Sequence, residues 1–86
     1  MATYKVEWKT SALKELKNLD RSVIPRIVAA VESLSGNPRP SEVRKLQGSE
    51  HTYRIRVGEY RVVYETADFK LLVIIIRVRH RKDIYR

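Results

Sequence analysis

Three segments in the second half of the chain have the pattern of strands, two by alternation and one as a long apolar run, and only short connections separate them. They are TYRIRV at residues 52–57, YRVVYET at residues 60–66 and a long, mostly apolar run at residues 71–79. A period of two is typical of a strand that buries one face, and short connections join antiparallel neighbours. The pattern therefore predicts a three-stranded antiparallel meander, which needs a cover on at least one face.

The first half of the chain supplies a strand and two helices as that cover. YKVEW at residues 4–8 also alternates, and we expect it to join an edge of the meander. Apolar residues recur at helical spacing over residues 12–19 and 24–34, and residues 43–46 form a short extended segment. We therefore predict an α+β protein in which an N-terminal strand and a helical hairpin pack on one face of a small antiparallel sheet, in the order β-α-α-β-β-β.

Capping residues and breaks indicate where the two helices begin and end. Thr10 and Ser11 are preferred N-cap types before the first helix. Ser22 is the expected cap of the second helix, which places Pro25 in the first turn, where its missing N–H does no harm. The stretch SGNPRP at residues 35–40 ends the second helix.

The sheet face away from the helices is expected to have a cationic end and an apolar end. The residues expected on it are Arg54, Arg56, Arg61, Val63, Glu65, Leu71, Val73, Ile75, Arg77 and Arg79. Burying so many guanidinium groups beneath the helices would cost several kcal/mol, so the arginines are assigned to the open face. The strip formed by Leu71, Val73 and Ile75 then needs a cover, for which we expect a partner protein.

The charge of the chain indicates an acidic partner. Its 86 residues contain 18 Lys and Arg against 10 Asp and Glu, a formal net charge of +8. Nucleic acid, an anionic membrane surface and an acidic protein all fit such a balance. The length fits a single domain over residues 1–86.

Several function classes are disfavoured by composition. Without cysteine the chain has neither disulfides nor thiolate metal sites, and two histidines are too few for a typical zinc site. The apolar run at residues 71–76 is far shorter than the ~18 residues of a transmembrane helix, and the N-terminus lacks a secretory signal. We expect a cytoplasmic protein that uses no metal or cofactor and contacts no membrane.

The C-terminal stretch VRHRKDIYR adds cations and two possible proton carriers to the arginine face. Guanidinium forks match phosphate oxygens in pairs, and we expect four of them to hold successive backbone phosphates: Arg54, Arg56, Arg61 and Arg79. His80 and Tyr85 would add a stacking platform or proton donors. Because no Asp/Glu cluster stands near the patch to hold magnesium, RNA, which carries its own 2′-OH nucleophile, suits the patch as a substrate better than DNA. General nucleic-acid binding and catalysis both remain open at this level.

Four stretches resemble the RelE branch of the RelE/ParE toxin superfamily. They are NPRP (residues 37–40), KLQG (45–48), YRIRVGEYRVVYE (53–65) and RHRKDIYR (79–86). The resemblance implies a ribosome-dependent mRNA endonuclease, or mRNA interferase, that cuts the message in the ribosomal A site and thereby inhibits translation. It also implies a small antitoxin that is encoded beside the toxin and wraps around the toxin. The toxin–antitoxin pair then binds the operator DNA of its own genes.

Site residues follow from the same resemblance, position by position. The catalytic residues that it implies are Arg61, Arg81, Tyr85 and His80. Arg61 would stabilise the transition-state phosphate, Arg81 would lie near the leaving group and Tyr85 would act as general base. Because arginine has a pKa above ~12, we treat Arg81 as an electrostatic clamp and keep His80 as an alternative proton carrier.

The resemblance also implies basic residues that bind RNA without reacting. Lys45, Arg54 and Arg56 match positions that help to hold rRNA and mRNA. The apolar strip and the basic patch together suit an acidic or amphipathic antitoxin segment. Two other readings remain: a ParE-like toxin that poisons DNA gyrase, and a non-catalytic module that binds nucleic acid or antitoxin.

Overall fold

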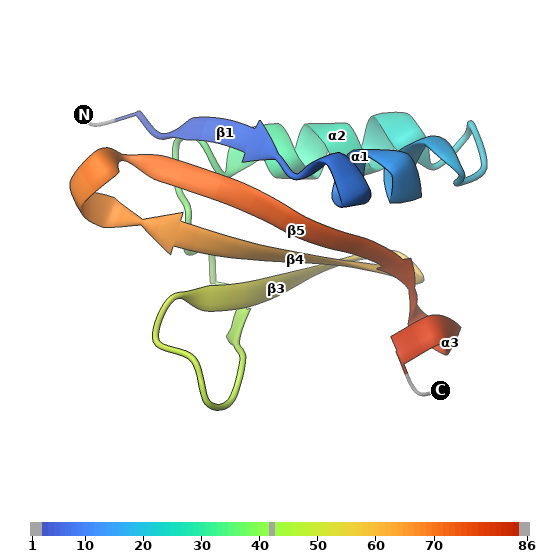
Figure 1. Cartoon of the computed structure of the whole chain (residues 1–86). Coiled ribbons are helices and arrows are strands. Elements are labelled where there is room, and N and C mark those ends of the chain that lie inside the picture. Colours follow the sequence, from blue (N-terminus) through green and yellow to red (C-terminus); the bar gives the residue numbers. More distant parts are fainter. Residues whose placement is uncertain (1–2, 42, 85–86) are drawn as a thin grey trace.

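A five-stranded sheet carries two helices on one side in the computed structural model, which describes residues 3–41 and 43–84. The strands lie in the order β1-β5-β4-β3-β2, and both longer helices cover the same face (Figure 1). The strands are β1 (Lys5–Trp8), β2 (Arg44–Lys45), β3 (Thr52–Val57), β4 (Tyr60–Ala67) and β5 (Leu72–His80). The helices are α1 (Thr10–Lys17), α2 (Ile24–Ser33), the 3-10 turn η1 (Asp68–Lys70) and α3 (Arg81–Ile84).

The α+β architecture and the meander are confirmed, with one difference at the edge of the sheet. Strands β3, β4 and β5 are antiparallel neighbours, and β2 adds to β3 in the same sense. Strand β1 joins β5 in parallel, with Val6 opposite Val73. The sheet is therefore mixed, because the helical hairpin carries the chain back before β2 to β5 are laid down.

The predicted helix caps are wrong. Helix α1 starts after Lys9 and α2 after Val23, and neither N-cap side chain bonds to its helix. Ser22 instead donates its N–H and its hydroxyl to Asp20 Oδ1, each at 3.0 Å. These hydrogen bonds lower the pKa of Asp20. Local side-chain hydrogen bonding therefore forms a turn before α2 where the sequence offered a cap.

A β-bulge in β5 reverses the expected faces of its first half. Val63 pairs with Arg77 while the next residue, Tyr64, pairs with Ile75, so Ile76 is an extra residue in β5. Because side chains alternate with a period of two, one extra residue exchanges the two faces on one side of it. The arginines after the bulge keep their predicted face, whereas the apolar residues before it do not.

The predicted apolar strip of Leu71, Val73 and Ile75 is consequently wrong as an exposed surface. Val73 and Ile75 are fully buried in the core, and only Leu71, 40% exposed, is accessible. Leu72 and Ile74 lie instead on the open face, opposite Ala67 and Glu65 of β4. A docked partner therefore cannot contact Val73 or Ile75 without unfolding the sheet.

The core lies between the helix pair and the sheet. Its fully buried side chains come from both layers: Ala12, Ile27, Leu34, Val62, Tyr64, Val73 and Ile75. Complete burial of one large aliphatic side chain stabilises a fold by about 1.5–3 kcal/mol. The strands of the second half thus need α1 and α2 to bury one face of the sheet. The opposite face remains accessible for binding. None of the helices in the described residues is long and apolar enough to cross a bilayer.

Candidate functional site

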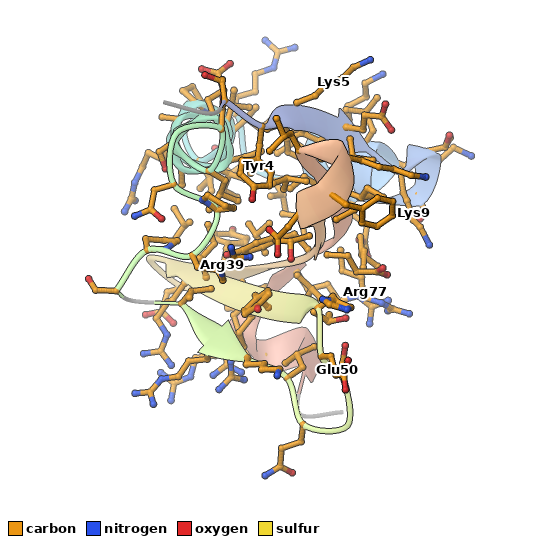
Figure 2. The ribbon with its side chains drawn as sticks, turned by 90° about the vertical axis from the view of Figure 1, so that its left-hand side faces the viewer. Tyr4, Lys5, Lys9, Arg39, Glu50 and Arg77 are labelled. Atoms are coloured by element: carbon orange, nitrogen blue, oxygen red, sulfur yellow. The ribbon has the colours of Figure 1, made fainter. Side chains whose placement is uncertain are left out.

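An open cleft rich in arginine lies on β2, β3, the β3–β4 turn and the start of β4. Its volume is about 610 Å³, and it is lined by Arg44, Arg54, Ile55, Arg56, Gly58 and Arg61. We call it the arginine cleft. Figure 2 shows side chains that end in nitrogen gathered beside β2, with Arg77 well apart from them in this view. The structure thus brings together Arg54, Arg56 and Arg61, as the sequence predicted.

Strand register places these guanidinium groups side by side. Arg56 lies directly opposite Arg61, and Arg44 directly opposite Arg54. Opposite residues of an antiparallel pair have Cβ atoms roughly 4.5–5.5 Å apart, and like charges there are destabilising. The apolar residues of β3 and β4 fix the register, so the arginines stay side by side although their charges repel. A bound polyanion would offset this repulsion.

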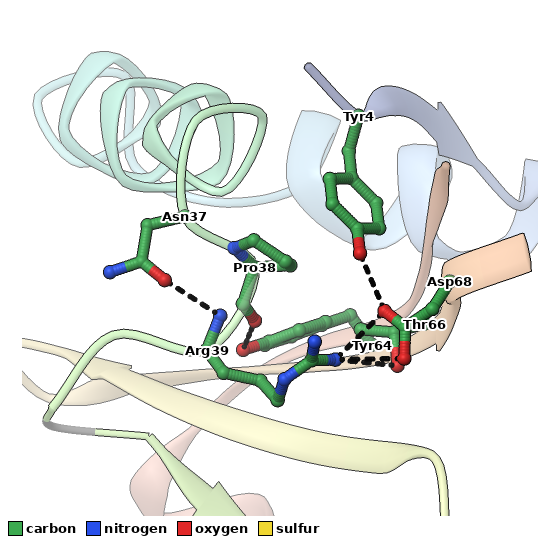
Figure 3. A network of polar contacts seen from close by, with 7 residues as sticks. All are labelled: Tyr4, Asn37, Pro38, Arg39, Tyr64, Thr66 and Asp68. Carbon is green, nitrogen blue, oxygen red and sulfur yellow. Dashed lines mark hydrogen bonds and ion pairs between the residues drawn. The ribbon is translucent and has the colours of Figure 1, made fainter. Parts of the chain in front are cut away.

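Two arginines outside the cleft are neutralised by acidic partners, and the first is Arg39. Its Nη1 binds Asp68 Oδ1 at 3.0 Å, and the Tyr4 hydroxyl donates to the same oxygen at 2.6 Å (Figure 3). The hydrogen bond from Tyr4, followed by that from Arg39, lowers the pKa of Asp68. Nearby, the buried Tyr64 hydroxyl donates to the Pro38 carbonyl at 2.7 Å. This network ties the loop after α2 to the β4–β5 connection, away from the arginine cleft.

Arg79 is the second neutralised arginine. The Glu15 carboxylate of α1 accepts from Arg79 Nε and from the Val78 backbone N–H, each at 3.0 Å. Although Arg79 lies opposite Arg61 in the sheet, its side chain lines a second cleft of about 490 Å³, between α1 and the end of β5. The predicted role of Arg79 in binding phosphate therefore does not fit its position in this structure.

The cations of the arginine cleft are arranged differently. Among the described residues, Arg44, Arg54 and Arg56 have no acidic partner within ion-pair distance. Arg61 is only 5% exposed, so its side chain is held in place within the cleft wall. One fixed guanidinium beside three accessible ones is suited to hold one phosphate rigidly and to attract its neighbours.

His80 does not line the arginine cleft. It lies opposite Tyr60, with the two rings edge to face at 5.0 Å between centroids, and lines the second cleft. Its Nδ1 accepts the Lys82 backbone N–H at 3.1 Å, so Nε2 carries the proton of the neutral ring. The structure therefore places the side chains of both His80 and Arg79 at the second cleft and not in the arginine cleft.

The remaining predicted residues lie at the margins or outside the described part. Arg81 is exposed and begins α3, and its backbone N–H donates to the Glu59 carbonyl at 2.7 Å, beside the β3–β4 turn. Lys45 is exposed but pairs with Tyr53, which turns it to the opposite face from Arg44. Tyr85 lies outside the described residues.

Arg44 is the cleft residue that the sequence analysis missed. It lies in a strand of two residues, which is too short for its faces to be read from the alternation of side chains. The family motif begins at the neighbouring Lys45, which faces the other way. Among the residues described, no group of three or more His, Cys, Asp and Glu could hold a metal ion.

The fold and the cleft define a class: a small α+β protein that gathers one buried arginine and three more accessible ones in a cleft on its sheet. A family model described as the ParE toxin of type II toxin–antitoxin systems, parDE, matches residues 6–85. Toxin RelG of Mycobacterium tuberculosis is 39% identical, over 96% of this chain and 97% of its own length. The mRNA interferase toxin RelE of Escherichia coli is 31% identical, over 95% and 90%.

Solved structures agree with these matches. The RelE–RelB complex of Pyrococcus horikoshii superposes with a TM-score of 0.82 at 30% identity, covering 92% of this chain and 96% of that one. The isolated E. coli RelE toxin gives 0.80 at 29% identity, covering 95% and 90%. The chain therefore belongs to the RelE/ParE family of toxins of type II toxin–antitoxin systems, as the four stretches of sequence indicated.

Proposed function

We propose that this protein is the toxin of a toxin–antitoxin pair and cuts mRNA in the ribosomal A site without a metal ion. The observation that carries the proposal is the arginine cleft, with Arg61 fixed in its wall and three more arginines around it. The E. coli relative named an mRNA interferase supports the same activity.

The reaction uses the nucleophile that RNA supplies. The 2′-oxygen attacks the adjacent phosphorus, the bond to the 5′-oxygen breaks, and the products are a 2′,3′-cyclic phosphate and a 5′-hydroxyl. A base takes the 2′-OH proton and the leaving oxygen gains one. Arg61 holds the non-bridging oxygens, whose negative charge grows in the transition state. Arg54 and Arg56 bind the flanking phosphates.

We assign proton transfer and leaving-group stabilisation to the C-terminal segment. Tyr85 is the proposed general base, because the cations close to it in the sequence would favour the ionised form of its phenol. Arg81 would act as an electrostatic clamp on the leaving oxygen from the start of α3, close to the turn that lines the cleft. His80 receives no role, since it lines the second cleft.

An antitoxin is the proposed protein partner. The P. horikoshii relative was solved as a complex with RelB, and an M. tuberculosis relative as the RelBE2 toxin–antitoxin complex. An acidic or amphipathic antitoxin segment would neutralise the arginine cleft and cover Leu72 and Ile74 of the open face, together with the exposed Leu71 just before β5. Operator DNA would be bound only by the toxin–antitoxin complex.

A ParE-like action on DNA gyrase is the second candidate, because the matching family model carries the ParE description. Both activities would arrest growth, but they act on different targets. The two are separated by which process stops first after the toxin is expressed without its antitoxin.

Adding the protein to a translating extract is expected to produce messages cut within the codon that occupies the A site. The cuts should require ribosomes, because the cleft holds a phosphate but does not by itself align the 2′-oxygen with the leaving group. Mapping the 3′ and 5′ ends of the messages measures this. Intact messages, together with gyrase-dependent DNA breaks in cells, would favour the ParE-like candidate instead.

A further inference from the structure

Arg26 of α2 lies against the turn that forms one wall of the arginine cleft. A Cβ atom placed on Gly58 would be 3.2 Å from Arg26 Nη2 and 3.7 Å from both Cζ and Nη1. The guanidinium therefore lies directly over the Gly58 backbone, where a larger residue would displace it. Gly58 has a φ of +59°, which also favours glycine. Because Gly58 lines the arginine cleft, Arg26 extends its cationic surface around the β3–β4 turn.

Neither the helix nor an acidic side chain stabilises Arg26 in this position. It is exposed and is the third residue of α2, whose first turn contains no acidic residue. The N-terminal end of a helix carries partial positive charge, so a cation there is destabilising. Within the described part of the chain, Arg26 has neither an ion pair nor a hydrogen bond. It resembles Arg44, Arg54 and Arg56 in this respect.

We propose that Arg26 binds a phosphodiester of the RNA backbone, next to the phosphates held in the arginine cleft. The inference rests on the proposed function, since it extends the same RNA path from the open face of the sheet around the turn onto α2. A guanidinium fork binds two phosphate oxygens at once, and the glycine beneath it leaves the room that the guanidinium needs beside the cleft. The phosphate belongs either to ribosomal RNA or to the message.

Affinity for ribosomes as a function of salt tests the proposal, with Arg26→Gln compared with the wild type. We expect affinity to fall about 3- to 10-fold, and the slope of log affinity against log salt to decrease by about one, as for one lost phosphate contact. Arg26→Lys should show nearly the wild-type salt slope, because lysine keeps the positive charge although it lacks the guanidinium fork. Lys70→Gln is the matched control, since it removes one exposed charge at the other end of β4; its slope should stay closer to that of the wild type.

Two arms distinguish the source of the phosphate. If Arg26→Gln loses affinity equally for vacant and for message-programmed ribosomes, the phosphate belongs to ribosomal RNA. If it loses affinity only for programmed ribosomes, the phosphate belongs to the message. An Arg26→Gln variant with unchanged affinity and slope would overturn the proposal, as would one that loses affinity only for the antitoxin. Message cleavage by the wild type, measured in parallel, tests the proposed function separately, because ribosome binding does not depend on the chemical step.

Discussion

Replacing Arg61 with alanine is expected to reduce the rate of message cleavage on ribosomes by about 10²- to 10³-fold, the loss typical of one preorganised donor to a developing oxyanion. Arg61 is 5% exposed and lies opposite Arg56 in the cleft. Its guanidinium is therefore fixed before substrate arrives, and water cannot substitute for it at low cost. Because its strongest interaction forms in the transition state, the loss should appear in kcat more than in KM.

Single-turnover cleavage at saturating ribosome concentration measures this effect. Arg77→Ala is the matched control, because Arg77 also lies on the open face but is exposed and opposite Val63; we expect a change of no more than a few-fold. Thermal melting of both variants checks that the fold persists. If Arg61→Ala cleaves as fast as Arg77→Ala while remaining folded, the cleft does not contain the catalytic centre.

The second large effect concerns stability and follows from the β-bulge. Ile75→Ala is expected to lower the free energy of unfolding by about 2–5 kcal/mol, because a fully buried side chain is lost from the core. In a domain of this size each kcal/mol shifts Tm by roughly 4–8 °C. Ile74→Ala should cost clearly less, since Ile74 is half-buried on the open face opposite Glu65.

Chemical denaturation of the two variants side by side tests the assignment of faces. Unbroken alternation along β5, which would put Ile74 beneath the helices and leave Ile75 exposed, predicts the reverse order of the two losses. Equal losses for Ile74→Ala and Ile75→Ala would also contradict the observed register. The comparison matters for function, because the residues of β5 that an antitoxin can reach are those on the open face.

The bulge shows where sequence reasoning fails in this chain. Residues 52–57 alternate between apolar and polar or charged side chains, and residues 60–66 do so except at Val63; the strands and faces of both segments agree with the prediction. The run LLVIII in β5 is apolar in both phases of the alternation, so it fits either face equally well. Only pairing with β4 reveals the extra residue, Ile76.

The candidate site was predictable to a similar extent. Arg54, Arg56 and Arg61 follow from strand alternation, because charge keeps them out of the core. The neutralisation of Arg79 by Glu15 joins residues far apart in the sequence, and local patterns contain no signal for such a pair. The position of Arg26 over Gly58 likewise depends on how α2 packs against the sheet.

The central claim is that the arginine cleft positions RNA for attack by its own 2′-oxygen, with no metal-bound water. A message with a single 2′-deoxynucleotide immediately 5′ of the mapped cleavage site tests this directly on programmed ribosomes. The account predicts that cutting at that site stops, whereas the all-ribose message yields a 2′,3′-cyclic phosphate and a 5′-hydroxyl. Continued cutting of the deoxy-substituted message at the same phosphate would contradict it.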